Sequence, residues 1–307
     1  MKGELEGKVA IVTGAGTGLG RLHALQLASM GAAVVVNDLG AAVDGAGRDE
    51  SKGRGVVEEI EKAGGRAVVH FGDVADWKAA EGLVQTAIDS FGDLHILVNN
   101  AGFTRDATIF NIGEEEFDSV VRVHLKGHFA PSKFACIHWR EQAKRSGGAV
   151  YGRLVSTASE AFLFGNPGQP NYAAAKAGIT SFTMGIAQLM LKYGVTANVV
   201  MPRARTRMTM QGPNIAIFKE PEAGAFDTFH PQHVLPLFAY LCTPRAARIS
   251  GHLFIVWGRE IKVIGRPEPK QVFHVEDAWS VDSVHAKLDP YFAKLEPVKD
   301  GFTVPPM

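Results

Sequence analysis

Residues 9–20, VAIVTGAGTGLG, decide the fold of this chain. Residues 9–14 form an apolar, β-branched run that is typical of a buried strand, and a helical stripe follows directly. Gly14, Gly18 and Gly20 would let the turn between them approach a pyrophosphate, whose charge then lies at the helix N-terminus. The spacing G-x-x-x-G-x-G is a variant of the dinucleotide fingerprint, since G-x-G-x-x-G is not met. A tight turn without a ligand is the alternative interpretation.

The alternation of strand and helix continues along the chain. Most of the apolar runs lack a polar face, which is typical of parallel strands covered on both sides. The intervening segments show helical periodicity. We therefore predict a doubly wound α/β (Rossmann) sandwich with a seven-stranded parallel sheet and helices on both faces. The predicted strands are 9–14, 33–38, 67–74, 94–100, 152–159, 195–200 and 253–258.

Composition and charge narrow the class of protein. The 307 residues are enough for one large α/β domain, and 32 basic side chains balance 32 acidic ones. This balance does not favour nucleic acid or an anionic membrane as a partner. Cys136 and Cys242 lie in apolar segments, and their scarcity indicates a reducing compartment. No signal-peptide pattern or membrane-length apolar run is present. We expect a cytoplasmic protein without a metal site.

Two segments depart from the α/β rhythm. Residues 203–232 form a long connection rich in Met and Phe, which predicts a substrate lid. From Arg266 onward the sequence starts with the breakers RPEP and contains a helical pattern around 275–295, interrupted by Pro290. We therefore divide the chain into a Rossmann-fold domain, 1–265, and a C-terminal extension, 266–307. We expect the extension to pack on the domain or on a neighbouring subunit.

Asp38 ends the second predicted strand. A carboxylate there can hydrogen-bond both hydroxyls of an adenine ribose and would repel a 2′-phosphate. Because no Arg or Lys occurs between Asp38 and Arg48, the segment favours NAD over NADP. A plain turn residue is the alternative interpretation of Asp38.

Tyr172 and Lys176 lie in the stretch NYAAAKAG, residues 171–178. Their spacing places the phenol and the ammonium one turn apart on one helix face, and the alanines between them leave that face open. Such a pair also occurs by chance on surface helices. The other motifs of the chain decide between the two interpretations.

Four motifs together resemble those of the short-chain dehydrogenase/reductase family: TGAGTGLG (13–20), GDV (72–74), NNAG (99–102) and YAAAK (172–176). The resemblance covers roughly residues 5–260. VRVHLKGHF and GNPGQPNYAAAKAGI are similar to the branch that includes the dehydrogenase domain of peroxisomal multifunctional enzyme type 2 and actinobacterial hydroxysteroid and 3-hydroxyacyl-CoA dehydrogenases. The resemblance implies NAD-dependent interconversion of a secondary alcohol and a ketone.

The resemblance also implies roles by position. Ser159, Tyr172 and Lys176 take the catalytic positions, and His124 stands where the family usually has Asn. His124 is either part of a water relay behind Lys176 or a helix histidine satisfied by backbone groups. The implied contacts to the dinucleotide are Gly14, Gly16, Thr17, Gly18, Leu19, Gly20, Asp38, Asp73, Val74, Asn100, Ala101, Gly102, Tyr172, Lys176, Pro202 and Thr206.

These residues suit the oxidation of an alcohol. Tyr172 becomes a useful base at neutral pH if its pKa falls about 3 units below its usual value near 10, which we expect Lys176 and the oxidised nicotinamide to bring about. Ser159 would donate a hydrogen bond to the substrate oxygen. The Met- and Phe-rich lid and AFLFGNPG (161–168) favour a bulky apolar substrate.

The substrate itself stays open between a 3-hydroxyacyl-CoA and a hydroxysteroid, and a steroid CoA thioester would satisfy both. Arg203, Arg205 and Arg207 are either ligands of coenzyme A phosphates or solvated loop charges. An NADPH-dependent 3-oxoacyl-carrier-protein reductase is the alternative enzyme, which Asp38 argues against. A non-catalytic dinucleotide-sensing protein is more remote, because no catalytic residue is lost. Residues 177–191 are apolar nearly all round, which predicts a homodimer or homotetramer.

Overall fold

An eight-stranded sheet forms the centre of the structure, a computed structural model that describes residues 3–42, 44–210 and 217–298. The strand order is β3-β2-β1-β4-β5-β6-β7-β8. All neighbours are parallel except β8, which pairs antiparallel with β7. The strands are β1 (Val9–Thr13), β2 (Ala33–Asn37), β3 (Arg66–His70), β4 (Ile96–Asn99), β5 (Gly152–Thr157), β6 (Val195–Pro202), β7 (Leu253–Trp257) and β8 (Glu260–Ile264).

The predicted fold class is confirmed, and the seven predicted strands are all present, but the strand count was one too low. The missed strand, β8, has the sequence EIKVI, in which Ile261 and Val263 are 55% and 64% exposed. An edge strand at the end of a sheet does not need two buried faces. It therefore lacks the continuous apolar run by which the other strands were recognised.

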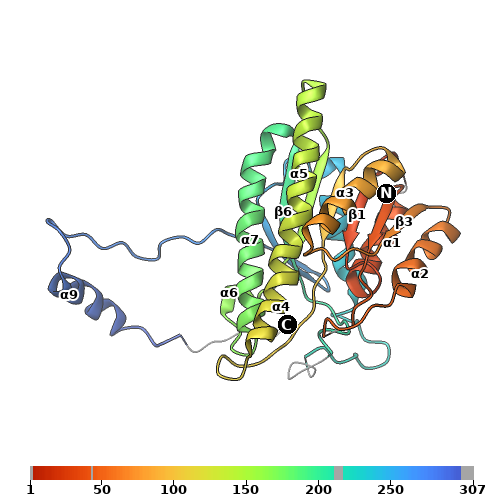
Figure 1. Cartoon of the computed structure of the whole chain (residues 1–307). Coiled ribbons are helices and arrows are strands. Elements are labelled where there is room, and N and C mark those ends of the chain that lie inside the picture. Colours follow the sequence, from red (N-terminus) through yellow and green to blue (C-terminus); the bar gives the residue numbers. More distant parts are fainter. Residues whose placement is uncertain (1–2, 43, 211–216, 299–307) are drawn as a thin grey trace.

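Helices cover both faces of the sheet, with the long helices α5 and α7 side by side on one of them (Figure 1). Within the described part of the chain, no helix is long and apolar enough to cross a membrane. The helices are α1 (Gly18–Ser29), α2 (Ser51–Lys62), α3 (Trp77–Phe91), α4 (Glu114–Val121), the π-helical turn η1 (Arg122–Lys126), α5 (Gly127–Ser146), α6 (Ala161–Phe164), α7 (Pro170–Met190), η2 (Leu191–Tyr193), η4 (Pro231–Val234), α8 (Leu235–Leu241), η5 (Pro244–Ala246) and α9 (Val281–Phe292).

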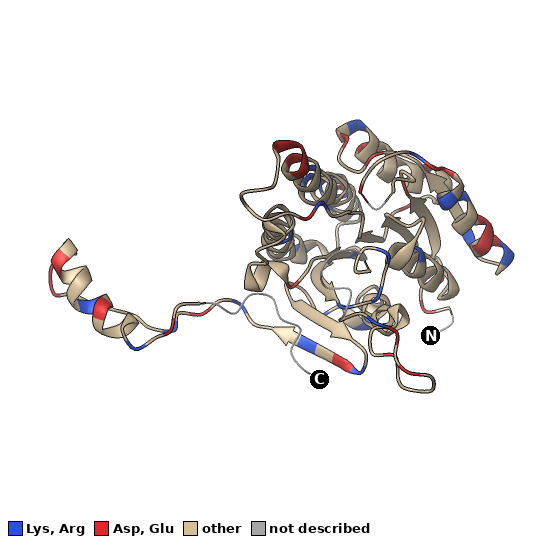
Figure 2. Cartoon of the chain, turned by 90° about the horizontal axis from the view of Figure 1, so that it is seen from below, with Lys and Arg blue, Asp and Glu red and all other residues tan. Residues whose placement is uncertain are grey.

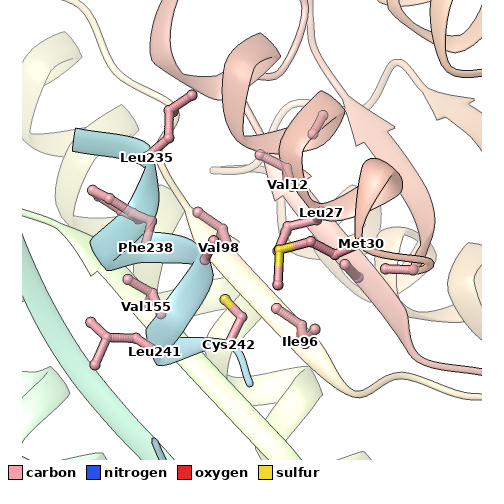
Figure 3. Close-up of a cluster of buried hydrophobic side chains, with 14 of the residues drawn as sticks. Val12, Leu27, Met30, Ile96, Val98, Val155, Leu235, Phe238, Leu241 and Cys242 are labelled. Carbon is pink, nitrogen blue, oxygen red and sulfur yellow. The ribbon is translucent and has the colours of Figure 1, made fainter. Parts of the chain in front are cut away.

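Alternate residues of β1 to β5 belong to two separate cores, and β6 and β7 also contribute to a third core around Phe229. In β1, Ala10 and Val12 pack with α1, α2 and α8, whereas Val9 and Ile11 pack with α3, α5 and α7. Figure 3 shows the first of these cores, in which Phe238 and Leu241 of α8 lie close to Val98 and Val155 of the sheet. Each aliphatic side chain buried in this way contributes about 1.5–3 kcal/mol to folding.

The two halves of the sheet diverge at β1. β2 and β3 lie on one side of β1, and β4 pairs with β1 on its other side. In doubly wound sheets, this switch point opens a crevice at the carboxyl ends of the strands. The functional site is therefore expected just beyond Thr13 and Asn99, the last residues of β1 and β4.

The C-terminal extension leaves the body of the molecule as an extended arm that carries α9 (Figure 1). A capping box between Ser280 and Ser283 starts α9, and Pro290 lies inside the helix, so the predicted interruption was wrong. Acidic and basic side chains are interspersed along the arm (Figure 2). α9 is described in full and buries none of its residues, so packing on its own domain is not seen. Packing on a neighbouring subunit stays a prediction. Residues 299–307 of the extension, and 211–216 of the lid with Ile215, lie outside the described residues.

Candidate active site

A cavity of about 570 Å³ lies at the carboxyl ends of the parallel strands. Its lining includes residues that directly follow β1, β2, β4 and β5, together with Gly72 two residues after β3 and Pro202 at the end of β6. All predicted site residues line this cavity except Gly16 and Gly20. Residues spread from position 14 to position 206 are therefore brought into one site.

The glycine loop fits the pyrophosphate of a dinucleotide. Gly14 and Gly18 adopt positive φ angles of 62° and 55°, a conformation that favours glycine. A Cβ on Gly20 would overlap the carbonyl oxygen of Gly14, so Gly20 allows the helix to pack against the turn. The first turn of α1 carries no acidic side chain, and its residues Gly18 and Leu19 line the cavity, which suits phosphate binding at a helix N-terminus.

Asp38 is held rigidly beside this loop. Its Oδ2 accepts a hydrogen bond from the Gly16 N–H, and its Oδ1 accepts one from the Gly40 N–H, each at 2.6 Å. The sequence analysis missed Lys52, whose Nζ donates to the Gly40 carbonyl at 2.9 Å. Lys52 lies on α2, beyond the segment 38–48 in which basic residues were sought. The fold brings its ammonium to the Gly40 carbonyl, two residues after Asp38.

Thr13 fixes the predicted NNAG segment at the switch point. The Thr13 hydroxyl accepts hydrogen bonds from the N–H groups of Asn100 (2.9 Å) and Ala101 (3.1 Å), and Asn100 Nδ2 donates to the Thr13 carbonyl at 3.1 Å. A Cβ on Gly14 would lie 2.8 Å from the Ala101 Cα. These bonds join the ends of β1 and β4, so Thr13 is a positioning residue. It was not predicted because it ends an apolar run that was interpreted only as a strand.

The predicted catalytic groups Ser159, Tyr172 and Lys176 meet where β5 ends against α7. The Lys176 Nζ is 5.4 Å from the centre of the Tyr172 ring and donates to the Thr157 carbonyl at 2.7 Å. The Ser159 hydroxyl hydrogen-bonds to Tyr172. The start of α7 is anchored by Asn171, whose Nδ2 donates to the carbonyls of Arg105 and Glu116 at 3.1 Å each.

Burial dominates the protonation of this group. Burial raises the pKa of Tyr172 to about 12, the Ser159 hydrogen bond opposes that rise, and the negative charge of Asp106 adds to it. Burial also lowers the pKa of Lys176 to about 7. The net effect of the chain's own residues is therefore to raise the Tyr172 pKa, and the lowering expected from Lys176 together with the oxidised nicotinamide stays a prediction. The expectation omitted the desolvation of both groups.

His124 lies in the π-helical turn η1 and faces the same site. Its Nε2 is 3.1 Å from the Phe103 nitrogen and 2.7 Å from the Phe103 oxygen, so the neutral ring can satisfy one of these groups at a time. Its ring meets that of Tyr172 edge-on, with centroids 5.1 Å apart. Burial lowers the pKa of His124 to about 3, and the Lys176 charge adds to this effect. The contacts favour the backbone-bonded interpretation of His124, and the water relay stays a prediction.

The arginines after β6 do not form one basic patch. Arg203 is 5% exposed, stacks 4.0 Å from the centre of the Trp257 ring and binds both oxygens of Glu160, at 2.5 and 2.6 Å. Arg205 pairs with Asp227. Arg203 and Arg205 are therefore not solvated loop charges, and their role as phosphate ligands stays a prediction. Each carries an internal counter-ion.

The apolar residues predicted near the substrate lie in two environments, the protein core and the cavity wall. Phe162 and Leu163 pack against the core cluster around Phe229, whereas Met208 and Phe218 line the cavity. Several polar residues that line the cavity were not predicted from the sequence. Among them, Gln169 Nε2 donates to Asp106 Oδ2 at 2.8 Å. Asp106 could have been predicted as a site residue because it is a carboxylate four residues after the NNAG motif.

Comparison with known proteins agrees with this geometry. The family model described as short chain dehydrogenase matches residues 8–214. The chain belongs to the short-chain dehydrogenase family. This short-chain dehydrogenase is 45% identical over 296 residues to the hydroxyacyl-CoA dehydrogenase ChsB1 of Mycobacterium tuberculosis, covering 96% of this chain and 91% of that protein. It is 37% identical to the peroxisomal multifunctional enzyme type 2 of Mus musculus, covering 89% of this chain and 36% of that protein.

A solved structure, a short chain dehydrogenase from Mycobacterium avium, is similar over nearly its whole length. Its TM-score is 0.83 and its sequence identity 43%, and the match covers 96% of this chain and 98% of that one. As a member of this family, the short-chain dehydrogenase described here is an oxidoreductase that acts on CH–OH groups and uses a nicotinamide dinucleotide.

The depressed pKa of His124 predicts acid sensitivity. Between the unfolded value of 6.5 and the folded value of about 3, the unfolded chain binds the proton and the folded chain does not. Stability from this group is therefore complete above pH 6.5 and falls by about 1.4 kcal/mol per pH unit as the pH drops below it. In urea unfolding at several pH values, His124→Gln should lose stability less steeply below pH 6.5 than the wild type.

The matched control is His274→Gln, because His274 is exposed on the C-terminal arm. This variant should follow the wild-type profile. Equal slopes for His124→Gln and the wild type, or an NMR titration that places the His124 pKa near 6.5, would contradict the prediction.

Proposed function

We propose that this short-chain dehydrogenase uses NAD to interconvert a secondary alcohol and a ketone on a 3-hydroxyacyl-CoA. The observation that carries the proposal is the meeting of Ser159, Tyr172 and Lys176 in one cavity whose other end contains Asp38. The first three groups suit proton transfer at an alcohol oxygen, and the carboxylate suits an unphosphorylated adenine ribose.

The chain's residues divide the reaction between them. In the oxidative direction, the Tyr172 oxygen accepts the hydroxyl proton while the Ser159 hydroxyl donates a hydrogen bond to the same substrate oxygen. The bound dinucleotide supplies the hydride acceptor and a positive charge that lowers the Tyr172 pKa. The Lys176 Nζ donates to the Thr157 carbonyl at 2.7 Å, and this hydrogen bond fixes the position of the ammonium and of its remaining N–H groups. In the reductive direction, Tyr172 returns the proton.

The substrate class is supported by the relatives. ChsB1 is named a hydroxyacyl-CoA dehydrogenase, and similar fungal proteins are named peroxisomal hydratase-dehydrogenase-epimerases. Met208 and Phe218 give the cavity apolar walls, which suit an acyl chain or a steroid ring system. A hydroxysteroid, or a steroid CoA thioester, is therefore the alternative substrate. Arg203 and Arg205 do not support phosphate binding, since Glu160 and Asp227 neutralise them.

The proposal includes a homo-oligomer. On α5 and α7, Phe129 and Leu189 are 45% and 61% exposed, more than a helix needs for packing on one sheet. The arm carries further exposed apolar residues, among them Trp279 at 48% and Phe292 at 58%. An isologous contact through α5 and α7, with α9 docked on the neighbouring subunit, would cover both surfaces.

Removing the phenolic oxygen tests the chemistry. Tyr172→Phe should lower kcat for NAD-dependent oxidation of a 3-hydroxyacyl-CoA by about 10²–10⁴-fold, because the proton acceptor is lost. The affinity for NAD, measured by fluorescence titration, should change little. Tyr193→Phe, outside the cavity, is the matched control and should retain activity. Full activity of Tyr172→Phe would refute the mechanism, and oxidation of hydroxysteroids alone would favour the alternative substrate.

Replacing Asp38 tests the cofactor choice. Asp38→Ser removes both the ribose ligand and the repulsion of a 2′-phosphate, and Lys52 lies one peptide away. The ratio of kcat/KM for NAD to that for NADP should fall by about tenfold to a hundredfold. Adding Lys52→Ala should remove any gain with NADP. A wild-type enzyme that prefers NADP would exclude the proposed choice.

Light scattering tests the oligomer. The wild type should have the mass of two or four chains, and Leu189→Glu should give a smaller species because a charge cannot be buried unpaired in the contact. Phe292→Glu should weaken the assembly if α9 docks on a neighbour. Ile109→Glu is the control, since Ile109 is 70% exposed and belongs to none of α5, α7 and α9. A monomeric wild type would rule out the contact.

A further inference from the structure

The stretch Arg203-Ala204-Arg205-Thr206-Arg207 carries three arginines in different environments. Arg203 is neutralised by Glu160 and Arg205 by Asp227. Arg207 is exposed, lines the cavity and makes no ion pair with any residue that the structure describes. Its Nη2 donates to the Thr17 hydroxyl at 2.6 Å. One uncompensated positive charge of the lid therefore lies against the glycine loop.

Thr17 is the residue immediately before α1. Its backbone is extended, yet its side chain makes no capping hydrogen bond to α1 in the described structure. The N–H groups of the first turn consequently have no side-chain acceptor there, and no carboxylate occurs in that turn. A guanidinium beside the positive end of a helix is unfavourable unless an anion lies between them. The two donors together suit a group with several negatively charged oxygens.

The position of Arg207 is set by a hydrogen-bonded turn of the lid. Thr206 N–H donates to the Thr209 hydroxyl at 2.8 Å, and that hydroxyl donates to the Ala204 carbonyl at 2.9 Å. Arg205, paired with Asp227, holds the base of the same segment. Thr206, predicted to contact the nicotinamide, and Arg207 at the glycine loop are adjacent residues of this one turn.

We propose that Arg207 binds the pyrophosphate of the dinucleotide from the lid side, opposite the N-terminus of α1. Arginine suits this role because its planar guanidinium donates two parallel hydrogen bonds to phosphate oxygens. The lid turn already contacts the glycine loop through Arg207 and Thr17, so a pyrophosphate bound there would hold these two segments together. This inference rests on the proposed function, since it requires a dinucleotide in the cavity.

The test compares three ligands by calorimetric titration: NAD, ADP-ribose and adenosine. ADP-ribose keeps the pyrophosphate without the nicotinamide, and adenosine lacks both. Arg207→Ala should bind NAD and ADP-ribose about tenfold to a hundredfold more weakly and bind adenosine as the wild type does. Arg207→Lys should recover part of the loss, and the affinity of the wild type should fall more steeply with salt than that of Arg207→Ala. Arg248→Ala, an exposed arginine outside the cavity, should match the wild type.

Several results would overturn the inference. Unchanged ADP-ribose affinity in Arg207→Ala would do so, as would an equal loss for adenosine, which would indicate a structural role. In a parallel titration with free coenzyme A, a loss of affinity confined to that ligand would reassign Arg207 to the phosphates of the substrate. These outcomes leave the proposed function intact if the wild type binds NAD. A wild type that binds neither NAD nor ADP-ribose would overturn both proposals.

Discussion

The buried ammonium of Lys176 is the constraint on which the site depends. It is 2% exposed and donates to the Thr157 carbonyl, the last carbonyl of β5. Burying a charge is unfavourable, and the pKa of Lys176 falls to about 7 in consequence. The hydrogen bond offsets part of that cost and ties α7 to the end of β5. Tyr172, one turn earlier on α7, and Ser159, two residues after Thr157, are thereby brought together.

A second buried charge pair supports the same region from the other side. Glu160 directly follows Ser159, and Arg203 directly follows β6, so their ion pair joins the serine loop to the base of the lid. Removing one partner would leave the other charge buried and uncompensated, which is strongly destabilising. Arg203 also stacks on Trp257, the last residue of β7, so the ends of β5, β6 and β7 are all connected here. The lid is thus fixed at its base, while Arg207 contacts Thr17 of the glycine loop.

The local patterns that predicted the fold are those with a direct physical cause. Apolar β-branched runs require burial on both faces, and they located the seven parallel strands. The edge strand β8 was missed because half of its side chains face solvent. The glycine, GDV and NNAG motifs lie at the ends of β1, β3 and β4, and parallel strands bring these ends to one edge, so most of their predicted residues line one cavity. Lys52, Thr13 and Asp106 escaped because their roles depend on contacts between segments distant in sequence.

The sequence by itself determined the doubly wound sheet, the position of the glycine loop after β1 and the Tyr172–Lys176 spacing, since these follow from periodicity within single elements. Only the tertiary structure decided the electrostatics. Whether Arg203 is a ligand or a buried ion-pair partner depends on Glu160, which is distant in sequence and adjacent in space. Whether Tyr172 is more or less acidic than a free phenol depends on desolvation. Burial and charge pairing are properties of the folded neighbourhood, and no local pattern contains them.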